Sequence, residues 1–261
     1  MLNRTDMAKC PFTAEAAQYV KSLQLHLSDL SKEEYKPILA RALSKIENAL
    51  VNGRISLEWE DDEIEVLSYP TALMLLSMVG DEWAYRRYAL AESKRAYELL
   101  REDSSKLSLI VATNTFKWNA RLTDEKTDQG YYDHALHFKD YLGGTSLLRD
   151  SKWKLANRTL EGGFVRLTKD EFCRILAESI QKRVLSRTVA TTKVPSIFQP
   201  YIDRIRQLLA RHRVILRDEE VPKIVTPTAF PPCMEKMYGT VSAGKNLSHI
   251  GRFALTSFLV N

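Results

Sequence analysis

The chain has 261 residues, of which 44% are hydrophobic and 27% charged, and its formal net charge is +5. This is the composition of an ordinary globular protein with a sizeable core, and it excludes low-complexity linkers. The basic excess mildly favours an anionic partner. Three widely spaced cysteines, Cys10, Cys173 and Cys233, exclude a disulfide framework and indicate reduced thiols.

Two observations concern membranes and targeting. The first residues lack the apolar core of a signal peptide. The most apolar window, residues 71–80, is too short to span a bilayer. We therefore expect a cytoplasmic, soluble protein with no membrane partner.

The first 116 residues are expected to be mainly helical. Ser31 and Glu34 have the spacing of a capping box, and Gly53 is placed to end the helix that follows. Pro37 lies early in this run, so its first turns are expected to be kinked or separate. The acidic stretch 55–66 predicts a loop. The predicted helices span residues 11–27 (with Thr13 as N-cap), 31–53, 68–80 (starting near Pro70), 81–103 and 104–116.

The pattern changes between residues 121 and 168. Turn formers and aromatics fill 121–150, and two alternating runs flank Glu161-Gly162-Gly163. Glycine supplies the positive φ of a tight turn, so we predict a β-hairpin over 152–168. The capping box Thr168–Glu171 is expected to open a helix from 169 to about 187. A last full helix is expected over 196–214, and a proline-rich linker over 217–232.

These elements predict a mainly α (α+β) fold. A helical body over 1–216 would carry a small β element at about 121–168. The linker 217–232 would join it to a short C-terminal piece, 233–261.

Signatures of catalysis are missing from the sequence. It has no glycine-rich phosphate loop, no metalloprotease-type histidine pair and no carboxylate pair in an apolar strand, as two-metal nucleotidyl transfer would require. The acidic run "WEDDEIE", residues 59–65, is better explained as a solvated loop than as a metal site. We therefore predict no catalytic residues.

Basic residues are dense between 182 and 213. Two successive helices with this excess could form a stripe that follows a phosphate backbone, or they could be ordinary solvated faces, and the residues leave both interpretations open. The candidate backbone contacts are Arg183, Arg187, Arg204, Arg206, Arg211 and Arg213. A smaller cluster, Arg86, Arg87, Lys94 and Arg95, is partly offset by Glu92 and Glu98, and we predict that it is solvated.

The three cysteines differ in their surroundings. Cys10 and Cys173 lie at the edges of apolar elements and are predicted to be buried hydrophobic residues. Cys233 follows the stiff pair Pro231-Pro232, but the chain offers no second thiolate nearby to share a metal.

The stretch "FPPCMEKMYGTVSAGKNLSHIGRFALTSFLVN" resembles the start of the iron–sulfur domain of the large subunit of archaeal and eukaryotic DNA primase, in its archaeal form. Cys233, Leu247, His249, Arg252 and Phe253 occupy the places of that family's motif. "CPFTAEAAQYV" near the N-terminus, "HFKDYL" and "KWKLANRTLEGGFVRLTKDEF" are similar to the family as well. The resemblance covers nearly the whole chain.

The resemblance implies a non-catalytic regulatory subunit. It would bind and stabilise the small catalytic subunit as a heterodimer and support the initiation of RNA primers on a single-stranded DNA template. The family's C-terminal domain holds a 4Fe-4S cluster through four cysteines, of which Cys233 would be the first. We therefore expect a chain truncated inside an incomplete helical iron–sulfur domain, 233–261, and expect it to hold no cluster by itself.

The family's loop after the first cysteine contacts the initiating nucleoside triphosphate and the template. By position, the corresponding residues are Asn246, Ser248, His249 and Arg252. A guanidinium group can bind phosphate in bidentate fashion, and the neighbouring side chains add donors. Without the resemblance, His249 and Arg252 would be assigned to the capping or solvation of one helix face.

Two rival functions remain at this stage. One is a helical protein-interaction scaffold that does not bind nucleic acid. The other is an enzyme in its own right, which only the acidic run 59–65 supports. For the leading interpretation, the surface for the small subunit is expected to be apolar and to lie near Tyr131–Leu142 or the hairpin 152–168.

Overall fold

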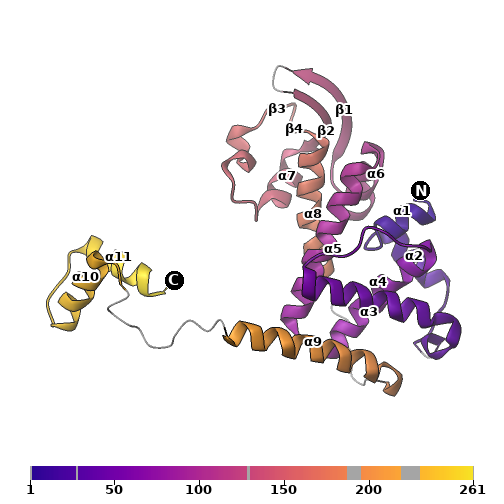
Figure 1. Ribbon diagram of the computed structural model, residues 1–261. Helices are drawn as coiled ribbons and strands as arrows, with labels where there is room; N and C mark the ends of the chain where they lie inside the picture. Colours follow the sequence, from indigo (N-terminus) through magenta and orange to yellow (C-terminus); the bar gives the residue numbers. More distant parts are fainter. Residues whose placement is uncertain (1, 28, 128–129, 187–194, 219–229, 261) are drawn as a thin grey trace. The chain divides into compact units, whose positions relative to one another are not determined.

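The computed structural model describes residues 2–27, 29–127, 130–186, 195–218 and 230–260. The chain divides into two compact units, Met1–Arg211 and His212–Asn261 (Figure 1). Its helices are α1 (Arg4–Lys9), α2 (Ala14–Ser22), α3 (Lys36–Asn52), α4 (Asp62–Val79), α5 (Glu82–Glu102), α6 (Ser105–Ile110), α7 (Phe138–Thr145), α8 (Lys169–Leu185), α9 (Gln199–Asp218), α10 (Pro232–Ser242) and α11 (His249–Val260). None of the helices in the described ranges is long and apolar enough to cross a membrane.

Short elements complete the first unit. A π-helical turn, η3 (Val111–Thr115), continues α6. The strands are β1 (Ala120–Thr127), β2 (Gly130–His137), β3 (Leu160–Glu161) and β4 (Phe164–Leu167). The 3-10 turns are η1 (Asp29–Ser31), η2 (Glu33–Tyr35), η4 (Ser151–Trp153), η5 (Leu155–Asn157) and η6 (Ser196–Phe198).

Several helix ends lie where the sequence predicts them. The Thr13 hydroxyl accepts from the Ala16 amide at the start of α2. Thr168 and Glu171 form a capping box at the start of α8. Gly53 ends α3 with a φ of 66°, a left-handed conformation that glycine adopts at little cost. Before α3 the chain forms the separate turns η1 and η2, and Pro37 lies in the first turn of the helix.

The prediction for residues 55–80 is wrong in one respect. The acidic stretch does not stay a loop as far as residue 66, because Asp61 caps a helix that starts at Asp62 and continues through Pro70 to Val79. Acidic residues favour a helix start, where the helix dipole is positive. Most side chains from Glu65 to Met78 are buried, so tertiary packing outweighs the hydrogen bond that the proline removes.

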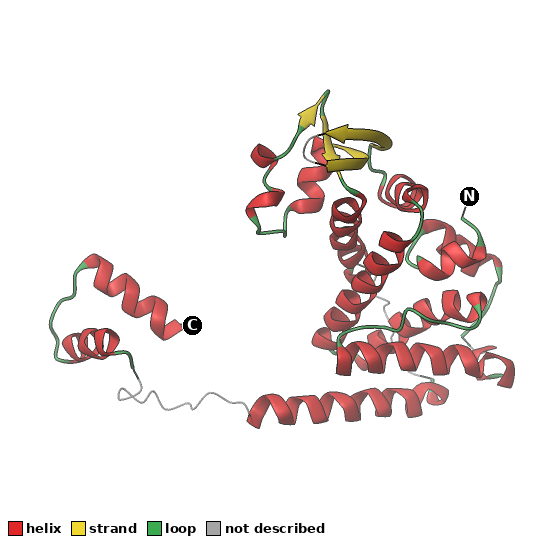
Figure 2. Ribbon diagram, turned by 45° about the horizontal axis from the view of Figure 1, so that its top comes forward, coloured by secondary structure: helices red, strands yellow, loops and turns green. Residues whose placement is uncertain are grey.

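A four-stranded antiparallel sheet in the order β1-β2-β4-β3 lies at one end of the helical body (Figure 2). The predicted hairpin is present but short: Gly162 and Gly163 turn between β3 and β4 with φ values of 55° and 83°. Residues 151–157 form the turns η4 and η5 instead of a strand, and the longer partner of β4 is β2. The mainly helical fold with a small β element is confirmed.

Helix α8 joins the sheet to the helical body. It packs along α5 and touches β2, β4, α6 and α7. Gly144 allows the approach of α7, because a Cβ atom there would lie 2.4 Å from Cγ2 of Ile175 on α8. This packing fixes the surface on which α7 and the end of α8 meet.

The second unit is small. Its helices α10 and α11 pack on each other, and the Phe230 ring makes edge contacts with Tyr238 and Phe258 at centroid distances of 5.5 and 5.1 Å. Leu255 is buried, whereas Ile250 and Phe253 are 79% and 71% exposed. The unit therefore has a thin core and an exposed apolar side on α11.

Candidate nucleic-acid interface

The acidic run supplies one residue to a buried ion network, which corrects two predictions of solvated surface. Lys45 Nζ lies 2.6 Å from Glu65 Oε1, and Arg95 Nη2 lies 2.9 Å from the same oxygen. Arg41 Nε donates to Glu65 Oε2 at 2.7 Å. Glu65 and Arg95 are each 1% exposed, so neither belongs to a solvated loop or face.

This network is structural. Its members lie on α3 (Lys45), α4 (Glu65) and α5 (Arg95), so it ties three helices together. Burial alone would raise the pKa of Glu65, but the charges of Lys45 and Arg95 outweigh it and lower that pKa below its ordinary value. The described part of the chain contains no cluster of three or more His, Cys, Asp or Glu side chains that could hold a metal ion.

The predicted basic stripe is only partly assembled. Arg206 and Arg211 are exposed on α9, while Ile202 and Ile205 on the same helix are buried against the body. Arg204 Nε donates to Glu47 Oε1 at 2.7 Å, so its charge is offset. Arg187 lies outside the described residues, and the Arg213 side chain lies outside the described part of α9.

Arg183 has a different setting from the arginines of α9. Its Nε donates to the Phe12 carbonyl at 2.8 Å, and its guanidinium carbon lies 5.9 Å from the Phe116 ring centroid. These contacts place Arg183 beside η3 and in a hollow that Lys139 and Lys182 also line. Lys139 was missed as a candidate because only the fold brings it to the end of α8.

The four predicted nucleotide-binding residues gather at the start of α11. Asn246, Ser248, His249 and Arg252 are all exposed. The Ser248 hydroxyl accepts from the Gly251 amide at 3.2 Å, and the Ser248 carbonyl accepts from the Arg252 amide at 2.9 Å. Ser248 thus caps the helix. The first amides of a helix lack internal partners and favour anions, so the arrangement suits a phosphate group.

Cys233 is exposed in the first turn of α10. Cys10 and Cys173 are buried in the first unit, as predicted, and burial raises the pKa of the Cys173 thiol to about 12. Burial keeps both thiols protonated and unreactive. A 4Fe-4S cluster needs four thiolates. The described residues alone therefore do not form a site for it, and the assignment of Cys233 as one ligand stays a prediction.

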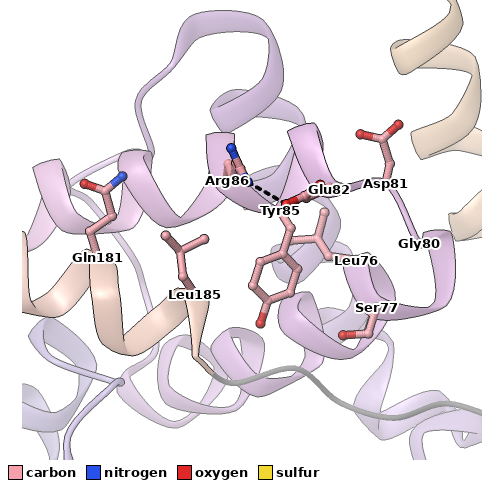
Figure 3. A pocket seen from close by; sticks show the side chains of 9 residues that line it. All are labelled: Leu76, Ser77, Gly80, Asp81, Glu82, Tyr85, Arg86, Gln181 and Leu185. Atoms are coloured by element: carbon pink, nitrogen blue, oxygen red, sulfur yellow. Dashed lines mark hydrogen bonds and ion pairs between the residues drawn. The ribbon is translucent and has the colours of Figure 1, made fainter.

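A further hollow of about 630 Å³ opens where α4 ends, α5 begins and α8 ends (Figure 3). Arg86 Nη2 lies 2.6 Å from Glu82 Oε1, and Asp81 accepts from the Ala84 amide. The Tyr85 hydroxyl donates to the Val184 carbonyl at 3.3 Å. Because its polar groups serve the fold, we assign no ligand to this hollow.

The chain is similar to known proteins over its whole length. The family model for the N-terminal domain of the eukaryotic and archaeal DNA primase large subunit matches residues 12–195, and that for its C-terminal domain matches residues 223–261. The DNA primase large subunit PriL of Methanocella arvoryzae is 36% identical over 270 residues, covering 100% of this chain and 70% of the relative. PriL of Methanosarcina mazei is 34% identical, covering 98% of this chain and 68% of the relative. PriL of Haloarcula marismortui is 30% identical, covering 97% and 72%.

Proposed function

Because the chain belongs to the family of large subunits of eukaryotic and archaeal DNA primase, we propose that it is the accessory subunit of a primase. In this role it binds and stabilises a small catalytic subunit and supports the initiation of RNA primers. The observation that carries the proposal is similarity over the whole chain, with both domains of the family in order.

The buried position of Glu65 supports a role without catalysis. The carboxylate of Glu65, which belongs to the acidic run, forms ion pairs with Lys45 and Arg95 and so connects three helices. A polymerase would need carboxylates that face solvent and hold two metal ions. In this proposal, the small subunit supplies them.

Exposed apolar side chains near the sheet support a docking surface for the small subunit. Single exposed apolar side chains are normal on a protein surface, but a group of large ones in one region indicates an interface. The members are Leu122 (38% exposed), Tyr131 (46%), Leu142 (47%), Leu147 (61%) and Leu160 (48%). We name this set the sheet-end patch. It includes the two regions favoured by the sequence, Tyr131–Leu142 and the hairpin.

Charge substitution in the sheet-end patch tests the docking surface. With an archaeal primase small subunit co-expressed, Tyr131→Asp combined with Leu142→Asp should abolish co-purification. Val51→Asp is the matched control, because Val51 is 59% exposed on α3, away from the sheet. Equal retention by both variants would place the interface elsewhere.

We assign the initiating nucleotide to the start of α11. Arg252 is exposed there, and its guanidinium can bind the 5′ phosphates. In a complex with a primase small subunit, Arg252→Ala should impair initiation from a nucleoside triphosphate and spare the extension of a preformed primer. Equal loss of both activities would make Arg252 structural.

Nucleic-acid backbone contacts are assigned to Arg206 and Arg211 on α9, which are exposed on the same helix. Each phosphate contact on a single strand contributes about −0.7 to the slope of log K against log salt. Replacing both by alanine should flatten the slope by up to about 1.4 in a single-stranded DNA titration. An unchanged slope would mean that they are ordinary surface residues.

A further inference from the structure

A hollow of about 450 Å³ lies between the segment that follows η3, helix α7 and the end of α8. Phe116 and Trp118 line one side of it, Gly143 belongs to α7, and Ser179 belongs to α8. Three cationic side chains, Lys139, Lys182 and Arg183, come from α7 and α8 and share the hollow with one acid, Asp140. Cations therefore exceed anions by two.

The two lysines of this hollow, Lys139 and Lys182, have charges that are not offset by a carboxylate partner in the described part of the chain. Lys182 Nζ donates to the Ser146 hydroxyl at 2.9 Å and to the Gly143 carbonyl at 3.3 Å, which are neutral groups. The Asp140 carboxylate accepts a hydrogen bond from the backbone amide of Asn119 at 2.9 Å, which fixes the orientation of the carboxylate.

Arg183 is held in place by the two contacts described above. The hydrogen bond to the Phe12 carbonyl and the contact with the Phe116 ring orient its guanidinium group. Cations that are oriented before a ligand arrives lose less entropy on binding. The hollow thus combines a fixed guanidinium, an oriented ammonium and an exposed ammonium from Lys139.

Gly143 keeps the hollow open. A Cβ atom at this position would meet nothing within 4 Å, so its side of α7 faces free space. Its neighbour Gly144 is different, since a Cβ there would collide with Ile175. A larger side chain at 143 would therefore project beside Lys182 without disturbing the packing of α7 on α8.

We propose that this hollow is a phosphate-binding site, which we name the α7–α8 pocket. Arginine and lysine side chains that converge on a concave surface with a nearby hydroxyl match the charge and hydrogen-bonding capacity of a phosphate group. The phosphate can be carried by a nucleoside triphosphate or by a nucleic-acid strand. The assignment of phosphate binding rests on the geometry of the pocket, whereas the choice of a nucleotide or a nucleic-acid strand as the carrier of the phosphate rests on the proposed function.

The test uses the full chain and a fluorescently labelled oligo(dT) followed by anisotropy at several salt concentrations. Lys139→Ala with Lys182→Ala should weaken binding and flatten the slope of log K against log salt by about 1.4, the value for two lost contacts. Lys21→Ala with Lys94→Ala is the matched control, because both lysines are exposed and lie outside the pocket. The control pair should leave the slope nearly unchanged.

Gly143→Glu provides a second variant that places a carboxylate beside Lys182. It should weaken binding as much as the double lysine variant, while Gly143→Ala should bind like the parent chain. Thermal unfolding of each variant should stay within a few degrees of the parent, so that a loss of binding is not a loss of folding.

Competition by ATP and by inorganic pyrophosphate identifies the carrier. If ATP displaces the oligonucleotide from the parent chain, and less from the variants, the pocket takes a nucleotide. If only longer oligonucleotides compete, it takes a strand. Equal binding by the parent, the lysine pair and Gly143→Glu for all ligands would overturn the pocket. That result would leave the accessory role untouched, because complex formation with the small subunit is measured separately.

Discussion

At the scale of single residues, two buried polar side chains have environments that the sequence does not suggest. Glu65 lies among three cations, and His134 lies in the interior against the Phe172 ring at 4.1 Å. The His134 Nε2 atom is 3.0 Å from the Ser108 hydroxyl and 3.3 Å from the Ser105 carbonyl. Each residue makes a separate prediction about stability.

Glu65→Gln should destabilise the chain by about 3–5 kcal/mol, because it removes the carboxylate that pairs with both Lys45 and Arg95 and leaves Glu92 as the one buried anion beside them among the described residues. Glu82→Gln is the control, since Glu82 belongs to an exposed pair with Arg86 and should cost less than about 1 kcal/mol. Urea unfolding measures both. A small, equal cost for the two variants would show that the Glu65 network contributes little.

His134 predicts a pH dependence of stability. Burial lowers its pKa from 6.5 to about 4, with the hydrogen bond to Ser105 acting in the opposite direction. Between these values the unfolded chain binds a proton that the folded chain does not, so stability should fall as pH decreases from 6.5 to 4. The loss from this group is up to about 3 kcal/mol, given about 1.4 kcal/mol for each pKa unit.

Comparison with His134→Gln isolates this effect from the titration of carboxylates. The variant should be less stable than the parent at pH 7.5, because it loses the ring contact with Phe172, and the difference should shrink towards pH 4. Urea unfolding at several pH values follows it. A difference that is constant with pH would mean that His134 is not buried in its neutral form.

At the scale of elements, local signals predict several helix ends, but the helix expected from Ser31 begins only at Lys36, after the turns η1 and η2. Tertiary effects are not visible in the local pattern. Capping residues such as Thr13 and Thr168 act within one turn, so the sequence shows them directly. The continuation of α4 through Pro70 depends on burial by other helices, which no local pattern reveals. For the same reason the sequence does not predict the burial of Arg95 or the α7–α8 pocket. The residues of the pocket are distant in the sequence and meet only after folding.

The adjacent glycines of α7 provide a prediction at this scale. Gly144→Ala should cost about 1–3 kcal/mol, because its Cβ would overpack against Cγ2 of Ile175. Gly143→Ala should be neutral or stabilising by up to about 1 kcal/mol, because its Cβ meets no atom and alanine favours the helix. Thermal unfolding distinguishes the two. Equal effects would contradict the close contact between α7 and α8.

At the scale of the whole molecule, the two units have different sizes of core. The first unit holds nearly all of the buried apolar side chains. Among the described side chains of the second unit, a single apolar residue, Leu255, is buried. Docking of the small subunit is assigned to the first unit, and the contact of Arg252 with the initiating nucleotide to the second. Deletion of residues 221–261 should therefore leave the complex with the small subunit intact. Co-purification of the shortened chain checks this separation, and a lost complex would move part of the interface to the second unit.

An accessory partner of a primase catalytic subunit should form a stable complex with it. The most direct measurement is the mass, by light scattering after gel filtration, of an equimolar mixture of this chain with an archaeal primase small subunit. We expect one peak with the mass of a one-to-one heterodimer, and two separate peaks when the chain carries both Tyr131→Asp and Leu142→Asp. Separate peaks for the two unmodified chains at micromolar concentration would contradict it.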